Sequence, residues 1–192
     1  MTIIEVGTTV RGMGYRHSRE DILEAAIAVV LDAGMAGLTF NRVGERLGIS
    51  DRTVVYYFPT KSDLVTAVAG ALSVDLLGLL EQAFGSEPLT VAELLDRAWP
   101  TLTSGRADRV FALYFEMVGL ASSGQVPYDS LAKALVEGWV DWLALRTAGS
   151  TAAIRRRRAL AVVAQIDGLL LIRHVLGPDQ ADVAAKECGI RI

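Results

Sequence analysis

The sequence of this 192-residue chain predicts an all-α fold. Apolar residues recur every three or four positions through most of it, the spacing that one face of an α-helix produces. No segment shows the alternation of apolar and polar residues that a half-buried strand needs. Hydrophobic residues make up 52% of the chain, which is enough for a sizeable core, and glycine and proline divide it into separate helices.

The first helix is expected to begin at Ser18, which forms a capping-box-like start with Asp21, and to end at Gly34. Residues 1–17 show no clear periodicity and contain three glycines, which predicts a flexible N-terminal arm.

Two short helices follow. Thr39 opens one of them and Gly48 ends it, while Ser50 caps a helix of about two turns that Pro59 terminates. Two short helices joined by a glycine turn, the second rich in hydroxyls and cations, are typical of a helix-turn-helix. Because helices this short are unstable alone, the first helix must pack against them. We therefore predict a three-helix helix-turn-helix domain over residues 18–66.

The remaining residues, 67–192, predict a second helical domain. Thr60 and Asp63 form another capping-box-like start, for a helix that runs to about Phe84. Further helices are expected at about 89–104, 106–123, 128–147, 151–176 and 178–187, separated by glycine and proline turns.

Charge and cysteine content limit the possible functions. The net charge is −3, and neither residues 1–66 nor the rest are basic, so any contact with nucleic acid must come from a few well-placed cations. Cys188 is the only cysteine, and His17 and His174 are far apart, so no disulfide, metal site or cofactor is predicted.

The longest strongly apolar stretch, Ala159 to Ile172, is broken by Gln165 and Asp167, and we interpret it as too short and too polar to cross a bilayer. The N-terminus has no cationic segment followed by an apolar one, so no secretion signal is expected. We expect a cytoplasmic protein that does not contact membranes.

Residues 18–65 carry a more specific pattern, and here the chain resembles the tetracycline-repressor (TetR) family of bacterial transcription regulators. The matching positions are the run Ile22-Leu23-Glu24-Ala25-Ala26, Gly34, Leu38-Thr39, Val43, Gly48-Ile49-Ser50, Thr53, Tyr56-Tyr57-Phe58 and Lys61. Asp51 and Val55 depart from the family's pattern, and they affect the expected operator sequence more than binding itself. The resemblance implies a homodimer that docks the second helix of the motif in the major groove of a palindromic operator.

The residues expected to contact DNA lie on this motif or directly after it: Thr39, Arg42, Ser50, Arg52, Thr53, Val55, Tyr56, Tyr57 and Lys61. Thr39 and Ser50 are predicted first as helix caps, and Arg42 and Arg52 as the best candidates for base or phosphate contact. Lys61 is unfavourable in a first helical turn unless a phosphate lies nearby. Arg11 and Arg16 of the arm are within reach of DNA, although a frayed terminus is the better explanation of this segment.

The resemblance also implies a cavity for a small apolar effector in the C-terminal domain. Large apolar and isolated polar side chains suit such a site: Trp99, Phe111, Tyr114, Phe115, Glu116, Trp139, Trp142, Gln165 and Asp167. For each aromatic residue taken singly, packing in the core is the simpler interpretation. The family pattern places the dimer interface on the last long helices, where Leu160, Val163, Leu170, Val175 and Leu176 offer apolar surface.

These observations predict a DNA-binding transcriptional regulator, in the simplest case a repressor released by its effector. An enzyme is disfavoured because the sequence has no glycine-rich phosphate loop, no zinc-protease motif and no plausible nucleophile–base pair. A helical adaptor that binds ligands or proteins and has lost DNA binding stays open, because residues 1–66 are not basic.

Overall fold

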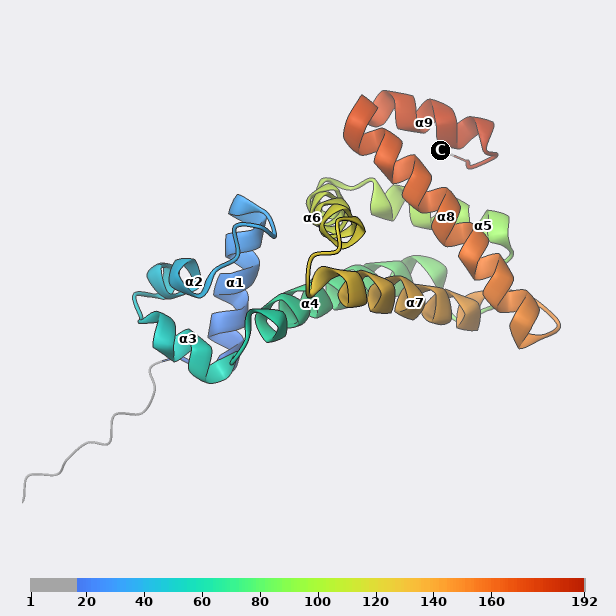
Figure 1. Cartoon of the computed structure of the whole chain (residues 1–192). Coiled ribbons are helices and arrows are strands. Elements are labelled where there is room, and N and C mark those ends of the chain that lie inside the picture. The colour runs from blue at the N-terminus through green and yellow to red at the C-terminus, as the bar shows by residue number, and fades with distance from the viewer. Residues whose placement is uncertain (1–16, 192) are drawn as a thin grey trace, which may run out of the picture.

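The computed structural model describes residues 17–191, apart from the side chain of Arg106. Within this range the chain forms α1 (Arg19–Ala33), α2 (Phe40–Leu47), α3 (Asp51–Tyr57), α4 (Lys61–Phe84), α5 (Val91–Leu102), α6 (Gly105–Ser122), α7 (Tyr128–Arg146), α8 (Ala152–Leu176) and α9 (Pro178–Glu187) (Figure 1). The all-α prediction is confirmed: the described residues contain no strand, only one isolated bridge between Leu89 and Thr147. The predicted arm, with Arg11 and Arg16, lies outside the described residues except for His17.

Capping explains where several helices begin. Ser18, Thr60 and Thr90 each form a complete capping box with the acidic residue three positions later. The helix starts predicted at Ser18 and Thr60 are therefore confirmed. The remaining helices agree with the predicted ranges to within about two residues, which is the usual uncertainty of helix ends.

The first three helices form a small head at one end of the molecule (Figure 1). Val43 of α2 and Val54 of α3 are fully buried in the hydrophobic core together with Ile22 of α1. Gly44 lies where α2 meets the turn before α3, and a Cβ atom there would approach the carbonyl oxygen of Ile49 to 2.8 Å. This close approach of two backbone segments sets the angle between α2 and α3.

Replacing Gly44 with alanine is expected to destabilise the head by about 1–3 kcal/mol, because the new methyl group meets backbone that cannot rotate away. Gly70 in α4 is the matched control, since a Cβ atom there meets nothing within 4 Å. Its replacement by alanine should instead stabilise the helix by about 0.5–1 kcal/mol. Thermal unfolding of both variants measures the contrast, and equal unfolding temperatures would contradict this account of Gly44.

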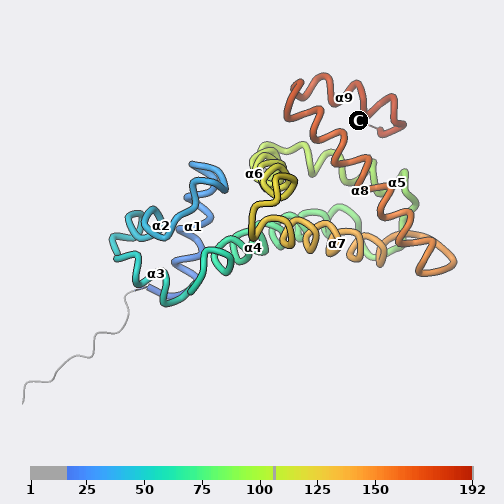
Figure 2. Tube along the Cα trace, in the orientation of Figure 1, coloured from blue at the N-terminus to red at the C-terminus, as the bar shows by residue number. Residues whose placement is uncertain are grey.

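Helix α4 connects the head to the rest of the chain (Figure 2). Its first turns bury Leu64, Val65 and Val68 in the core, and its later turns bury Leu76 and Leu80. The domain boundary expected between residues 66 and 67 thus falls inside a continuous helix of 24 residues. Helix α4 therefore belongs both to the head and to the larger bundle.

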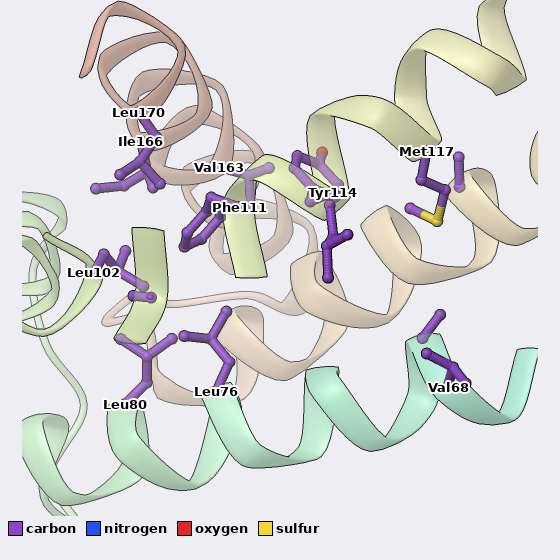
Figure 3. Packing of buried hydrophobic residues seen from close by; sticks show 14 of the residues in the cluster. Val68, Leu76, Leu80, Leu102, Phe111, Tyr114, Met117, Val163, Ile166 and Leu170 are labelled. Carbon is purple, nitrogen blue, oxygen red and sulfur yellow. The ribbon is translucent and has the colours of Figure 1, made fainter. Parts of the chain in front are cut away.

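Helices α4 to α8 surround the larger part of the core, where Phe111 of α6 lies close to Ile166 of α8 and to Leu76 and Leu80 of α4 (Figure 3). Helix α9 is fixed to this bundle by polar contacts. The indole Nε1 of Trp99 donates to Asp182 of α9 at 3.1 Å.

Two described helices, α4 and α8, are long and apolar enough to cross a membrane by length and composition alone. Residues 159–172 were expected to be too short for this, but they form only part of the 25-residue helix α8. Both helices contribute buried residues to the hydrophobic core.

Candidate functional site

Helix α3 presents one face to the core and the other to solvent. Val54 is fully buried, and Phe58, which follows the helix, is almost fully buried. The outward face carries exposed Asp51, Arg52 and Val55, with Tyr56 at 64% exposure. We call Arg52, Val55 and Tyr56 the α3 face.

The two predicted caps behave differently. The Thr39 hydroxyl accepts a hydrogen bond from the backbone N–H of Arg42 at 3.2 Å, so its capping role is confirmed. Ser50 occupies the N-cap position of α3, but its side chain makes no capping hydrogen bond. Its hydroxyl pairs instead with the Thr53 hydroxyl at 3.2 Å. The expected side-chain cap at Ser50 is wrong, because two neighbouring hydroxyls satisfy each other.

Four cations lie on or beside α2 and α3. Arg52 and Lys61 are exposed and form no ion pair with any described residue. Arg42 is also exposed, and its guanidinium donates to the carbonyl oxygen of Gly37 at 3.1 Å. Arg46, by contrast, forms an ion pair with Asp32 at 2.8 Å. The first three cations are therefore the ones open to an external anion.

The adjacent tyrosines point in different directions. Tyr57 is half-buried against the core, and its hydroxyl donates to the carbonyl oxygen of His17 at 2.9 Å. The Tyr56 ring meets the Tyr57 ring edge to face, with centroids 5.1 Å apart, and extends into solvent. Tyr57 therefore helps to hold the start of α1, and Tyr56 is the tyrosine on the outer surface.

A first cavity of about 50 Å³ lies inside the C-terminal bundle. Phe111, Trp139, Trp142 and Asp167, all predicted as ligand-contacting residues, are among the side chains that line it. A second cavity of about 30 Å³ adjoins it, since Trp139 lines both. Both volumes are far below the roughly 300–1,000 Å³ of typical ligand pockets, so neither cavity has room for a ligand of ordinary size in this conformation.

Tyr114 and Asp167 form the polar part of this region. The Tyr114 hydroxyl donates to the Asp167 carboxylate at 3.0 Å. Burial raises the pKa of the Asp167 carboxyl, and the hydrogen bond from Tyr114 partly opposes that rise. Burial, followed by the nearby carboxylate, also raises the pKa of the Tyr114 hydroxyl. The tyrosine therefore stays protonated and acts as the donor.

The other predicted ligand residues line neither cavity. Trp99 is buried and bonded to α9, and Phe115 packs its ring 6.0 Å from the His174 ring. Gln165 is half-buried but lines neither cavity. Glu116 instead contacts the turn between α1 and α2 in the head.

The predicted interface residues divide into two groups. Leu160, Val175 and Leu176 are exposed on α8. Val163 and Leu170 face inward, at 8% and 2% exposure, so the chain's own core covers them and they offer no surface to a partner.

Comparison with known proteins gives consistent results. The family model for bacterial regulatory proteins of the tetR family matches residues 22–68. Tetracycline repressor protein class C of Escherichia coli is 37% identical over 54 residues, which are 28% of this chain and 25% of that repressor's length. A TetR transcriptional regulator from Legionella pneumophila matches 93% of this chain and all of its own, with a TM-score of 0.67 and 21% identity. Residues 22–68 therefore carry the sequence pattern of the TetR family, and the described chain has the fold of a TetR transcriptional regulator.

Another similar solved structure is that of the multidrug binding protein EbrR in complex with proflavin. It is 26% identical, covers 88% of this chain and 96% of its own, and has a TM-score of 0.62. The likeness of fold to these two structures extends well beyond residues 22–68, so it includes the helices around the cavities.

A carboxylate of α6 holds the turn between α1 and α2. Glu116 accepts hydrogen bonds from the backbone N–H groups of Met35 at 2.8 Å and Ala36 at 2.9 Å. Gly34 makes room for it: its φ is +73°, and a Cβ atom there would lie 2.7 Å from the carboxylate. The Met35 side chain is buried and lines the second cavity. The head and the cavity region therefore touch directly at this turn.

Replacing Glu116 with alanine should leave these two N–H groups without their acceptor and weaken the attachment of the head by about 1–3 kcal/mol. Amide hydrogen exchange at Met35 and Ala36 is expected to become faster, while exchange in α8 stays unchanged. The matched variant Glu116→Gln keeps one acceptor oxygen and should give an intermediate effect. Unchanged exchange in both variants would show that the carboxylate does not hold the turn.

Sequence reasoning missed two residues of this region. Met35 carried one signal, a large apolar side chain in the otherwise small and flexible run Gly34 to Gly37. Ser73 interrupts the apolar run of α4, and its hydroxyl accepts a hydrogen bond from Trp139 Nε1 at 2.8 Å. The available signal was a small polar residue, Ser73, at a position within an apolar stretch of α4, where its hydroxyl needs a hydrogen-bond partner.

Proposed function

We propose that this TetR-family chain is a DNA-binding transcriptional regulator, acting as a homodimeric repressor on a palindromic operator and released by a small molecule. The α3 face carries the proposal. It combines a guanidinium, an aliphatic group and a phenol on the outer side of a helix-turn-helix, with Lys61 at the start of the next helix. These groups suit guanine, the thymine methyl and phosphate, respectively.

The dimer interface is proposed on the outer side of α8 and α9. Five of the eleven exposed large hydrophobic side chains among the described residues lie there: Leu160, Leu171, Val175, Leu176 and Val183. On α8 the exposed Ala164 and Gly168 fall between Leu160 and Leu171, at the spacing of one helical face. Small residues between larger ones favour close approach of a second helix. Twofold symmetry would place the two α3 helices in successive major grooves, roughly 34–36 Å apart.

Release of the operator DNA is proposed to begin at the two small cavities. A ligand of ordinary size fits only if Trp139 moves, and its hydrogen bond to Ser73 ties α7 to α4. Displacing Trp139 would disturb α4, which continues into the head. A typical coupling of about 1–3 kcal/mol would weaken operator binding about 5–150-fold. The complex of the relative EbrR with proflavin supports a small molecule as the effector.

The TetR family consists of transcription factors and not enzymes, in agreement with the prediction from sequence motifs. A regulator of this kind would act in the cytoplasm, where its DNA is found. The adaptor hypothesis keeps one observation in its favour: Asp51 exposes a carboxylate beside the α3 face, where it would repel phosphate unless a cytosine amino group donates to it.

Selection of duplexes from a random DNA pool by the purified full chain tests the proposal. Enrichment of a twofold-symmetric sequence is the expected result. A folded, dimeric protein that enriches no sequence would contradict DNA recognition and favour the adaptor.

A further inference from the structure

Asp167 is a carboxylate without a cationic partner. It lines the first cavity from α8, and its one hydrogen-bond donor among the described residues is the Tyr114 hydroxyl. Arg173, further along α8, is committed elsewhere: its guanidinium holds both oxygens of Asp108, at 2.7 and 2.9 Å. A half-buried carboxylate left without a counter-ion is costly, so an arriving positive charge would gain from meeting it.

The surroundings of Asp167 are aromatic. Phe111, Trp139 and Trp142 line the same cavity. The Tyr114 ring lies beside the Trp139 ring, with centroids 5.3 Å apart and planes inclined by 32°. Ring faces attract cations and stack on flat ligands, while aliphatic side chains supply the rest of the wall.

We propose that the effector is a flat aromatic molecule with one positive charge, which inserts beside Trp139 and pairs its charge with the Asp167 carboxylate. This inference rests on the proposed function and adds the charge and shape of the ligand to it. A neutral apolar molecule would use the aromatic walls but leave the carboxylate unpaired. An anion would be repelled by it.

The two small cavities have a route of entry. A surface groove of about 360 Å³ lies between α1, α4 and α6, where Arg109 and Asp75 are among its lining residues. Leu76 lines both this groove and the first cavity, and Leu72 and Val110 line both the groove and the second cavity. Rotation of these side chains would join the groove to the cavities and give a flat ligand access to Asp167.

Proflavin and acridine test the inference on the full-length dimer, because they share a ring system and at pH 8 only proflavin carries a positive charge. Titration followed by dye fluorescence should show proflavin binding at least about tenfold more tightly, the usual scale for a hydrogen bond or pair that involves a charged group. The variant Asp167→Asn keeps the shape and the acceptor for Tyr114. It should lose about tenfold or more in proflavin affinity and less than about threefold in acridine affinity.

Glu137→Gln is the control, since it removes one exposed negative charge from α7 without touching the cavity. It should bind both dyes as the wild type does. Equal affinity of the wild type for the two dyes would overturn the inference even if Asp167→Asn did not fold. So would binding of neither dye, or equal losses for both dyes in Asp167→Asn. Failure of the proposed function would appear separately, as absence of sequence-specific DNA binding.

Discussion

Replacing Arg52 with alanine is expected to reduce affinity for the selected operator about 30-fold or more, since each bidentate arginine contact contributes about 1–3 kcal/mol and a symmetric dimer has two of them. Arg52 is exposed on the α3 face and forms no ion pair within the described residues, so its removal leaves no buried partner unpaired. Mobility shift at fixed salt measures the reduction, and light scattering should show an intact dimer.

Lys133→Ala provides the control, because it removes one exposed positive charge from α7, outside the head. Its operator affinity should stay within about twofold of wild type, since screening weakens distant surface charges. If the Arg52 variant bound the operator as tightly as the control did, the assignment of α3 as the recognition helix would be wrong.

Replacing Leu171 with glutamate should convert the dimer to a monomer and abolish tight operator binding. Leu171 is exposed at 48% on the proposed interface, and dimerisation would bury the new carboxylate without a partner. The cost of about 3–5 kcal/mol corresponds to at least about a 100-fold increase in the Kd of the dimer. Sedimentation or light scattering across a concentration series measures this change.

Val74→Glu tests whether any exposed apolar position would have the same effect. Val74 is 69% exposed on α4, away from α8 and α9. This variant should remain dimeric and bind the operator. A dimeric Leu171→Glu variant would place the interface on another surface.

Much of the fold could be predicted from local signals. Ser18 with Asp21 and Thr60 with Asp63 fix helix starts through bonds between near neighbours, which are legible in the sequence. Gly34 and Gly48 end helices with positive φ values of 73° and 67°, a conformation that favours glycine. Such signals depend on a few adjacent residues, so they can be recognised without knowledge of the tertiary structure.

The outer face of α8 could not be predicted in the same way. Apolar residues occur nearly all round this helix, so periodicity does not distinguish the core side from the exposed side. Val163 and Leu170 were predicted on the interface but lie in the core, whereas Leu171, next to Leu170, is exposed. Only the packing of α8 against α5, α6, α7 and α9 decides which side is covered.

The roles of Glu116 and Tyr57 depended on distant contacts as well. Glu116 was predicted to contact the effector as a polar group in an apolar helix, yet its partners lie about 80 residues earlier in the chain. Tyr57 bonds to His17, 40 positions away. A single sequence shows that such polar groups need partners, but it does not identify the partners.

The most direct test of DNA recognition is a salt titration of wild-type binding to the selected duplex and to a scrambled duplex of equal composition. We expect the selected duplex to bind at least about 1,000-fold more tightly at physiological salt, with affinity falling steeply as salt rises. The Lys61→Ala variant should lower the slope of log affinity against log salt by about one for each phosphate that the lysine neutralises. Equal affinity for the two duplexes would contradict sequence-specific recognition by this chain.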